Sequence, residues 1–226
     1  MTGGYSGHGV STGPNNRARA LALSTALAAV AAVTMATGGA GAAQQGTAPE
    51  LGRTVNIALV EGTVLVRPKG EKQFHRLTVS ELVPIGSTID TRNGRVGLTS
   101  AVDTYGAVRT GEFWAGLFVV TQRRRTNAVT ELLLRGRLAN CPAKGTRSSA
   151  AAAKRKKGRR LWGNGKGKFR TKGRRSSALV RGTVWLVYDQ CDASTYNAVR
   201  TGKVDVRDFR LKKTIRLTAG RKYIAR

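Results

Sequence analysis

The chain has 226 residues, of which 40 are Lys or Arg and only 12 are Asp or Glu. Without a targeting segment about 180 residues would remain, the size of one domain with one substantial core. The positive potential favours anionic partners, namely nucleic acid, lipid head groups or acidic envelope polymers, and net charge alone does not rank them. The two cysteines form no Cys-x-x-Cys pair, which excludes the usual zinc and redox motifs.

The N-terminal segment has the features of an export signal. Arg17 and Arg19 precede the uncharged, Ala-rich stretch 20–37, and Ala40-Gly41-Ala42 offers small residues at alternate positions for cleavage. We therefore expect residues 1–43 to be a signal peptide and the protein to be secreted or associated with the cell envelope. An uncleaved membrane anchor is the alternative, because stretch 20–37 is at the short end of what spans a bilayer.

Export determines the interpretation of the two cysteines. Outside the cytoplasm a lone pair is expected to be oxidised, so we predict a disulfide between Cys141 and Cys191. It would close a loop of about 50 residues. The alternative is two buried thiols in a chain that is kept reduced.

The remaining sequence predicts strands. Composition makes residues 44–53 a linker, and apolar residues alternate with polar or small ones from Val55 to Leu59. Pro84-Ile85-Gly86-Ser87 predicts a turn. Asn93-Gly94 lies between two apolar runs and predicts a hairpin with a type I′ turn.

Further strands are expected at 113–122, buried on both faces, and at 129–135. No clear helix pattern follows residue 43. Residues 143–160, inside a domain spanning 54–226, predict a disordered basic insertion because they combine repelling charges with no apolar stripe. The candidate core of the C-terminal part is Val180, Val184, Leu186, Val204 and Val206.

An internal echo connects the two ends of the domain. Residues 58–67 (ALVEGTVLVR) resemble residues 198–207 (AVRTGKVDVR), and Arg-Leu-Thr follows both at one fixed distance, at Arg76 and at Arg216. In both copies valines alternate with other residues after a glycine, so the two halves are expected to share one β unit.

The densest charge lies between Lys144 and Arg175, with 14 Lys or Arg and no acidic residue. One interpretation is a solvated loop followed by a strand, 167–172, whose alternate basic residues face water. The other is contact with anionic wall polymer or lipid head groups, and the export signal disfavours nucleic acid. The candidate anion-binding residues are Lys154, Arg155, Lys156, Lys157, Arg159, Arg160, Trp162, Arg170, Lys172, Arg174 and Arg175.

Several structural motifs resemble the FecR-type domain. They are Phe169-Arg-Thr-x-Gly173, Val180-Arg-Gly-Thr183 followed by Trp185 and Val187, Gly202-x-Val-x-Val206, and the closing Ala219-Gly220. Residues 55–122 resemble the opening of FecR-like domains of exported bacterial proteins. The resemblance implies an all-β fold, an antiparallel sandwich of jelly-roll-like form, outside the cytoplasm.

In well-known family members such a domain senses an outer-membrane transporter and controls a sigma factor through a membrane helix. The segment before residue 20 is too short to hold a sigma factor by a packed surface. The sequence is more similar to stand-alone FecR-like domains, to which binding or scaffolding is attributed. A membrane-anchored regulator of a sigma factor is the alternative.

The sequence offers little for catalysis. His75 is the one histidine after the signal segment, and the acidic residues are scattered among arginines. No calcium-loop or zinc spacing is present. We expect a non-enzymatic module without cofactor or metal, whose partner is an anionic envelope polymer, a lipid surface or an envelope protein.

Overall fold

The computed structural model describes residues 48–138, 141, 158–180 and 182–226, and this part contains strands and no helix. The expected all-β class is therefore confirmed. The strands are β1 Thr54–Arg67, β2 His75–Arg76, β3 Ser80–Pro84, β4 Thr88–Ala101, β5 Val108–Trp114, β6 Leu117–Gln122, β7 Thr130–Leu134, β8 Arg159–Gly165, β9 Phe169–Lys172, β10 Ser176–Val180, β11 Thr183–Asp189, β12 Thr195–Thr201, β13 Lys203–Asp208, β14 Lys213–Thr218 and β15 Lys222–Ala225.

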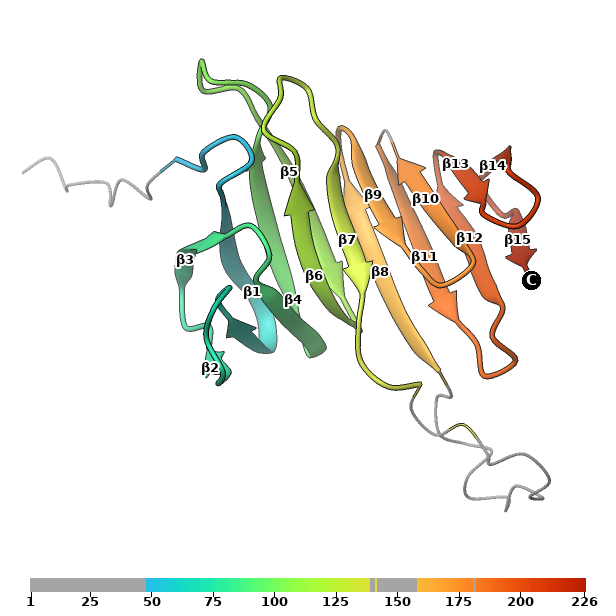
Figure 1. Ribbon diagram of the computed structural model, residues 1–226, viewed down its shortest axis with the longest axis horizontal. Coiled ribbons are helices and arrows are strands. Elements are labelled where there is room, and N and C mark those ends of the chain that lie inside the picture. Colours follow the sequence, from blue (N-terminus) through green and yellow to red (C-terminus); the bar gives the residue numbers. More distant parts are fainter. Residues whose placement is uncertain (1–47, 139–140, 142–157, 181) are drawn as a thin grey trace, which may run out of the picture. The chain divides into compact units, whose positions relative to one another are not determined.

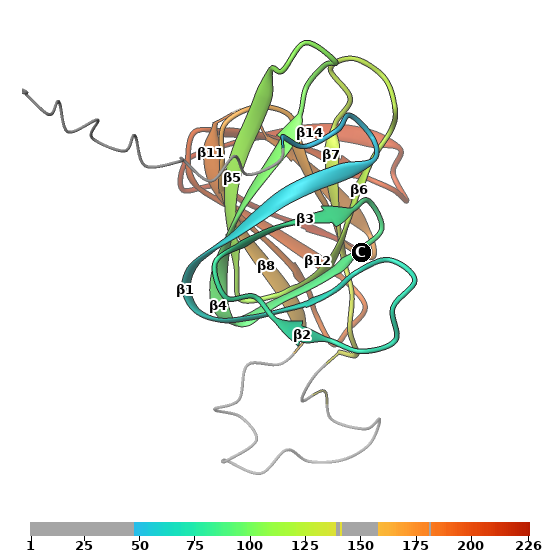
Figure 2. The same ribbon diagram turned by 90° about the vertical axis from the view of Figure 1, so that its left-hand side faces the viewer.

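The strands form one sheet that doubles over at β4 (Figures 1 and 2). The first half of β4 pairs with β6, which leads into the layer β6-β7-β9-β10-β13-β14. The second half pairs with β5, which leads into the layer β5-β8-β11-β12-β15. Neighbours pair antiparallel except β7 and β9, which are parallel. β1 pairs with β4 along its length and carries β2 and β3 on its other edge.

Four aromatic side chains fill the space between the two layers. Phe113 of β5 meets Phe118 of β6, Phe169 of β9 and Trp185 of β11 edge to face, at centroid distances of 5.4 to 5.9 Å. All four are fully buried. The indole Nε1 of Trp185 donates to Thr171 Oγ1 at 3.0 Å, which satisfies its polar atom in the core.

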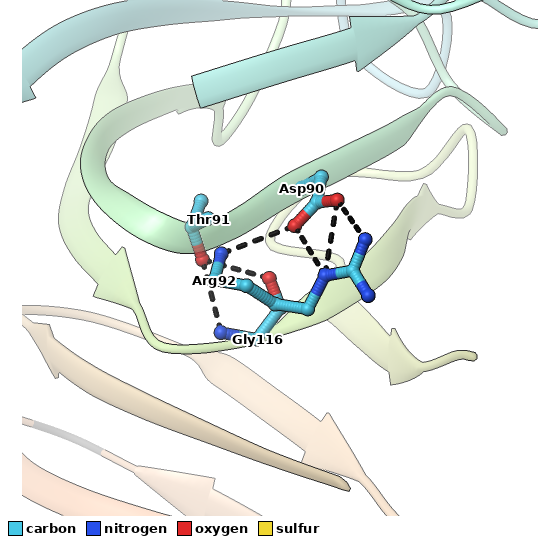
Figure 3. Close-up of polar contacts among 4 residues, drawn as sticks. All are labelled: Asp90, Thr91, Arg92 and Gly116. Atoms are coloured by element: carbon cyan, nitrogen blue, oxygen red, sulfur yellow. Dashed lines mark hydrogen bonds and ion pairs between the residues drawn. The ribbon is translucent and has the colours of Figure 1, made fainter. Parts of the chain in front are cut away.

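The single strand predicted at 113–122 is wrong, because the chain turns at Ala115 and Gly116 between β5 and β6. Thr91 of β4 holds this turn (Figure 3). Its N–H and its hydroxyl donate to the Gly116 carbonyl at 2.7 and 3.0 Å, and Ala115 N donates back to the Thr91 carbonyl. The adjacent Asp90 carboxylate accepts from the backbone and the guanidinium of Arg92. After this turn, the side chains of Phe113 and Phe118 both point into the space between the two layers.

The hairpin predicted at Asn93-Gly94 is also wrong, because β4 continues through it and pairs with β1. A side chain on Gly94 would lie 2.7 Å from the carbonyl oxygens of Glu61 and Thr63. The glycine therefore permits close approach of two bent strands and does not reverse the chain. The turn predicted at Pro84 to Ser87 is confirmed, with Ser87 N donating to the Pro84 carbonyl at 3.1 Å.

The predicted core of the C-terminal part is correct in two strands and out of phase in a third. Val180, Val204 and Val206 are buried as expected. In β11, however, Trp185 and Val187 point inward, whereas Val184 and Leu186 are half-buried on the outer side. The run Val-Trp-Leu-Val is apolar throughout, so its sequence carries no alternation from which the inner face could be chosen.

The internal echo corresponds to equivalent strand pairs. Leu65 and Val66 of β1 lie opposite Arg76 and His75 of β2. At the echoed positions, Asp205 and Val206 of β13 lie opposite Arg216 and Ile215 of β14. The similarity therefore extends to the register of pairing.

The predicted disulfide is confirmed, with a Cα–Cα distance of 5.4 Å between Cys141 and Cys191. Cys191 lies in the turn between β11 and β12. In the expected linker, residues 50–53 form a turn, and Gly52 N donates to Gln122 Oε1 at 2.9 Å. The expected signal peptide, 1–43, and residues 143–157 of the predicted insertion lie outside the described residues. The last two residues of the predicted insertion, Arg159 and Arg160, belong to β8, so the prediction of disorder is wrong for them.

Candidate anion-binding groove

The candidate basic residues fall in several places. Lys154, Arg155, Lys156 and Lys157 lie outside the described residues. Arg159 is committed to a structural ion pair, because its Nε lies 2.8 Å from Oδ2 of the fully buried Asp189. That carboxylate also accepts from Thr195 Oγ1 at 2.6 Å. Arg159 therefore compensates a buried charge and offers little to an external anion.

Trp162 and Arg160 lie on the outer face of one layer. Trp162 stacks on Trp114 of the neighbouring strand with a centroid distance of 6.1 Å. The guanidinium of Arg160 lies 4.8 Å from the ring centroid of Tyr188. Arg170 and Lys172 of β9 lie on the outer face of the other layer. The structure therefore does not bring Trp162 together with these two cations.

Arg174 and Arg175 occupy the turn between β9 and β10, and both are exposed. Their backbone N–H groups are used internally, since Arg174 N donates to Asp189 Oδ1 and Arg175 N donates to Thr195 Oγ1, both at 2.8 Å. The Nε of Arg175 donates to the Ala193 carbonyl at 3.4 Å. Their side chains do not line the groove described next.

The outer face of the layer containing β7, β9, β10 and β13 carries three hollows that share lining residues, and we call this surface the groove. One hollow of about 420 Å³ shares Glu131 and Arg170 with a second of about 420 Å³. It shares Leu179 and Asp205 with a third of about 430 Å³. The cationic side chains that line the three hollows are Arg123, Arg125, Arg170, Lys172, Lys203, Arg207 and Arg216.

Two cross-strand rows form the floor of this groove. The first row runs Glu131, Arg170, Leu179, Asp205 and Arg216 across β7, β9, β10, β13 and β14. Its charges compensate one another, because Arg170 lies 2.6 Å from Glu131 and Arg216 lies 2.8 Å from Asp205. This row is held together by its own ion pairs.

The second row is different because it carries only positive charge. Lys172 and Arg207 both lie opposite Ser177, and Thr214 follows on β14. Within the described residues, no carboxylate lies at ion-pairing distance from Lys172 or Arg207. The Lys172 ammonium lies 5.7 Å from the ring centroid of Phe209, which lines the same hollow. These two cations are two strands apart, about 10 Å.

The described residues contain no group of three side chains suited to hold a metal ion. His75 Nε2 lies 3.0 Å from Glu81 in an exposed pair at the edge formed by β2 and β3. That pair lies on β2 and β3, which pair with β1 and are not among the strands that carry the groove. The arrangement in the groove can attract and orient anions, and we find no nucleophile paired with a base in it.

Sequence reasoning missed Arg123, Arg125, Arg207 and Phe209. Arg123 and Arg125 belong to a visible run of three arginines after a strand, which could have been recognised. Arg207 could not, because its place in the same cross-strand row as Lys172 depends on the register of β9, β10 and β13.

No protein-family model, curated protein or solved structure matches this chain. Among the described residues no helix has the length and apolar character needed to cross a bilayer.

Proposed function

We propose that the chain is a non-enzymatic, FecR-like binding module outside the cytoplasm, and that it holds an acidic linear polymer of the cell envelope in the groove. The observation that carries the proposal is the pair of cations without an ion-pair partner, Lys172 and Arg207, which line the same hollow. The disulfide between Cys141 and Cys191 is compatible with the location.

The shape of the groove favours a chain over a planar surface. Three adjoining hollows extend across β7, β9, β10 and β13, so a flexible polymer can follow the floor while a bilayer contacts only the rim. Repeated negative charges along such a polymer would meet Lys172 and Arg207 in turn. Phe209, 36% exposed, and the half-buried Leu179 add apolar surface for the uncharged faces of sugar rings.

Binding of purified protein to polygalacturonate tests the proposal, with neutral dextran as the reference polymer. We expect Lys172→Gln with Arg207→Gln to weaken binding about tenfold and to lower the salt dependence by about two counterions. The matched control is Arg200→Gln with Lys222→Gln, which removes two exposed cations from β12 and β15.

Equal losses in the groove variant and the control would show that net charge alone drives binding and would overturn the proposal. Equally strong binding of dextran would do the same. Shortening of polygalacturonate during incubation would contradict the non-enzymatic assignment. Both double variants should unfold at the temperature of the unmodified protein, because none of the four side chains is buried.

A further inference from the structure

One end of the sandwich combines an exposed aromatic tip with basic loops. The β4–β5 and β6–β7 connections project at the same end in both views of the ribbon (Figures 1 and 2). Tyr105, in the β4–β5 connection, is 95% exposed, and Val108 at its base is 47% exposed. A tyrosine with this exposure packs against nothing in the fold.

The connections beside this tip carry cations. Arg123, Arg124 and Arg125 are exposed in the β6–β7 connection, and Lys166 and Lys168 flank the β8–β9 turn. Lys166 and Lys168 line a hollow of about 500 Å³ together with Val108. The loop that carries Tyr105 also contains one carboxylate, Asp103. It accepts the backbone N–H groups of Tyr105 and Ala107 at 2.9 and 3.1 Å and thereby shapes the tip.

A buried arginine ties the three connections to one another. Arg109 is 6% exposed, and its Nη1 donates to the carbonyls of Ala128 at 2.6 Å and Lys168 at 3.0 Å. Asn127 N in turn donates to the Val102 carbonyl at 2.7 Å. Burial lowers the pKa of Arg109 from its ordinary value. These hydrogen bonds therefore hold the backbones of the three connections together.

We propose that this end docks on an anionic phospholipid bilayer, with Tyr105 and Val108 at the head-group level and the cations of the neighbouring connections against lipid phosphates. A tyrosine has an apolar ring and a polar hydroxyl, which suits the interface between water and acyl chains. Lys and Arg beside such a tip add attraction to a negative leaflet. The hollow beside Val108, Lys166 and Lys168 gives a head-group phosphate room between the tip and two cations.

Unlike Phe209, which lines the groove, Tyr105 does not line the hollow beside it and projects into solvent, so it can enter the head-group region of a bilayer but offers a polymer no surface to follow. This is why a bilayer is the better occupant of this end. The proposal does not depend on the groove. Arg123 and Arg125 line both surfaces, so the test uses other residues.

The test is co-sedimentation of the full chain with vesicles of phosphatidylcholine, alone or mixed with phosphatidylglycerol. We expect binding only to the mixed vesicles. Lys166→Gln with Lys168→Gln should weaken it about 25-fold, since each cation beside an anionic leaflet contributes about fivefold. Tyr105→Ser with Val108→Ser should weaken binding at high salt as well as at low salt, because its contribution is apolar.

Matched controls remove the same chemistry elsewhere. Val79→Ser changes a valine that is 71% exposed in the β2–β3 connection, and Lys72→Gln with Lys222→Gln removes two exposed lysines. All variants carry the same N-terminal segment, so its contribution to vesicle binding is common to them.

Unchanged binding of the Tyr105 and Val108 variant, or equal binding to neutral vesicles, would overturn the proposal. If the Lys172 and Arg207 variant were the only one to lose vesicle binding, the proposal would also be overturned, because the groove would then be the lipid-binding surface. Binding of polygalacturonate by the Tyr105 and Val108 variant should equal that of the unmodified protein, so failure here is distinguishable from failure of the proposed function.

Discussion

The N-terminal and C-terminal halves of the domain use the same strand pairing, but their strands are interrupted differently. In the first half Leu59 lies opposite Val96 and Val66 lies opposite Ile89, within the continuous strands β1 and β4. In the second half the corresponding pairs are Val199 with Trp185 and Val206 with Ala178. From the first half to the second, the residue on one strand is displaced by one constant number of positions and its partner by another. The strands of the second half are each divided in two, because β12 and β13 together correspond to β1, and β10 and β11 together correspond to β4.

Both copies of the shared unit have a glycine at the equivalent position, Gly62 and Gly202. Gly62 and Gly202 both have positive φ, 71° and 79°. A side chain on Gly62 would lie 2.5 Å from the Asn93 carbonyl, and one on Gly202 would lie 2.6 Å from the Gly182 carbonyl. A sharp change of direction next to a carbonyl is thus common to both halves. Whether the strand ends there is a separate matter.

In one equivalent strand pair, the two halves place the large residue on opposite strands. Val96 faces Phe113 in the first half, whereas Trp185 faces Gly163 in the second. A side chain on Gly163 would lie 2.5 Å from the Trp185 ring. The large ring therefore comes from β5 in one half and from β11 in the other, and the two rings meet edge to face in the centre.

The disulfide has no counterpart in the first half, and its removal should have the largest effect. Cys141→Ser and Cys191→Ser should each lower the free energy of unfolding by about 4 kcal/mol, the chain-entropy value for a loop of this length. Urea titration measures this. Reduction of the unmodified protein should give the same loss. Clearly unequal losses for the two serine variants would contradict a purely cross-linking role.

Replacing Trp185 by the valine of the first half tests the exchange of large and small residues. Trp185→Val should cost about 3 kcal/mol, because it opens a cavity beside Gly163 and leaves Thr171 Oγ1 without its donor. Trp162→Val, on the half-buried outer face, is the control and should cost about 1 kcal/mol. Similar losses in both variants would mean that the centre of the core does not depend on Trp185.

The sequence predicted strands where apolar and polar residues alternate, as in Val204 and Val206, and the disulfide from the count of cysteines and the export signal. It misassigned β11, where four apolar residues follow one another, and Asn93-Gly94, where close backbone approach and a tight turn require the same glycine. Arg170 and Lys172 were recognised as candidates. Glu131 and Arg207 were not, because pairing of β7 with β9 places Glu131 beside Arg170, and pairing of β10 with both β9 and β13 places Arg207 two strands from Lys172. No local sequence pattern connects these residues.

Substitution of the two equivalent glycines separates backbone strain from strand continuity. Gly62→Ala should cost about 3 kcal/mol, because positive φ and the Asn93 carbonyl both oppose a side chain inside a strand paired along its length. Gly202→Ala should cost about 2 kcal/mol, since it lies between β12 and β13, where the chain can adjust. Thermal or urea unfolding measures both.

The control for the glycines is Gly220→Ala. Gly220 has φ of 76° but no atom within 4 Å of an added side chain, so only the conformational cost of about 1 kcal/mol applies. If all three substitutions cost the same, the close carbonyl is irrelevant and the equivalence of Gly62 and Gly202 reduces to their φ values.

The smallest expected effect concerns a hydrogen bond of the second half that has no equivalent in the first. Tyr223 of β15 donates its hydroxyl to Asp208 Oδ2 at 2.8 Å and so joins the ends of the two layers, which β14 and β15 do not do by pairing. Burial of Asp208 acts to raise its pKa, but hydrogen bonds from Leu211 N–H and from Tyr223 outweigh it and lower the pKa overall. Burial and this hydrogen bond also raise the pKa of Tyr223, so it stays a donor at neutral pH.

Tyr223→Phe should therefore cost about 1 kcal/mol at neutral pH. A carboxyl group with a lowered pKa stabilises the fold above its unfolded pKa, about 3.9, and this stabilisation is lost as the pH falls through the folded value. The difference between Tyr223→Phe and the unmodified protein should be constant near pH 7 and should shrink below about pH 4, as measured by urea unfolding across that range. Tyr196→Phe, on the half-buried outer face of β12, should show no such dependence. A difference that persists undiminished at low pH would mean that the Tyr223 hydroxyl stabilises the fold independently of the charge on the Asp208 carboxylate.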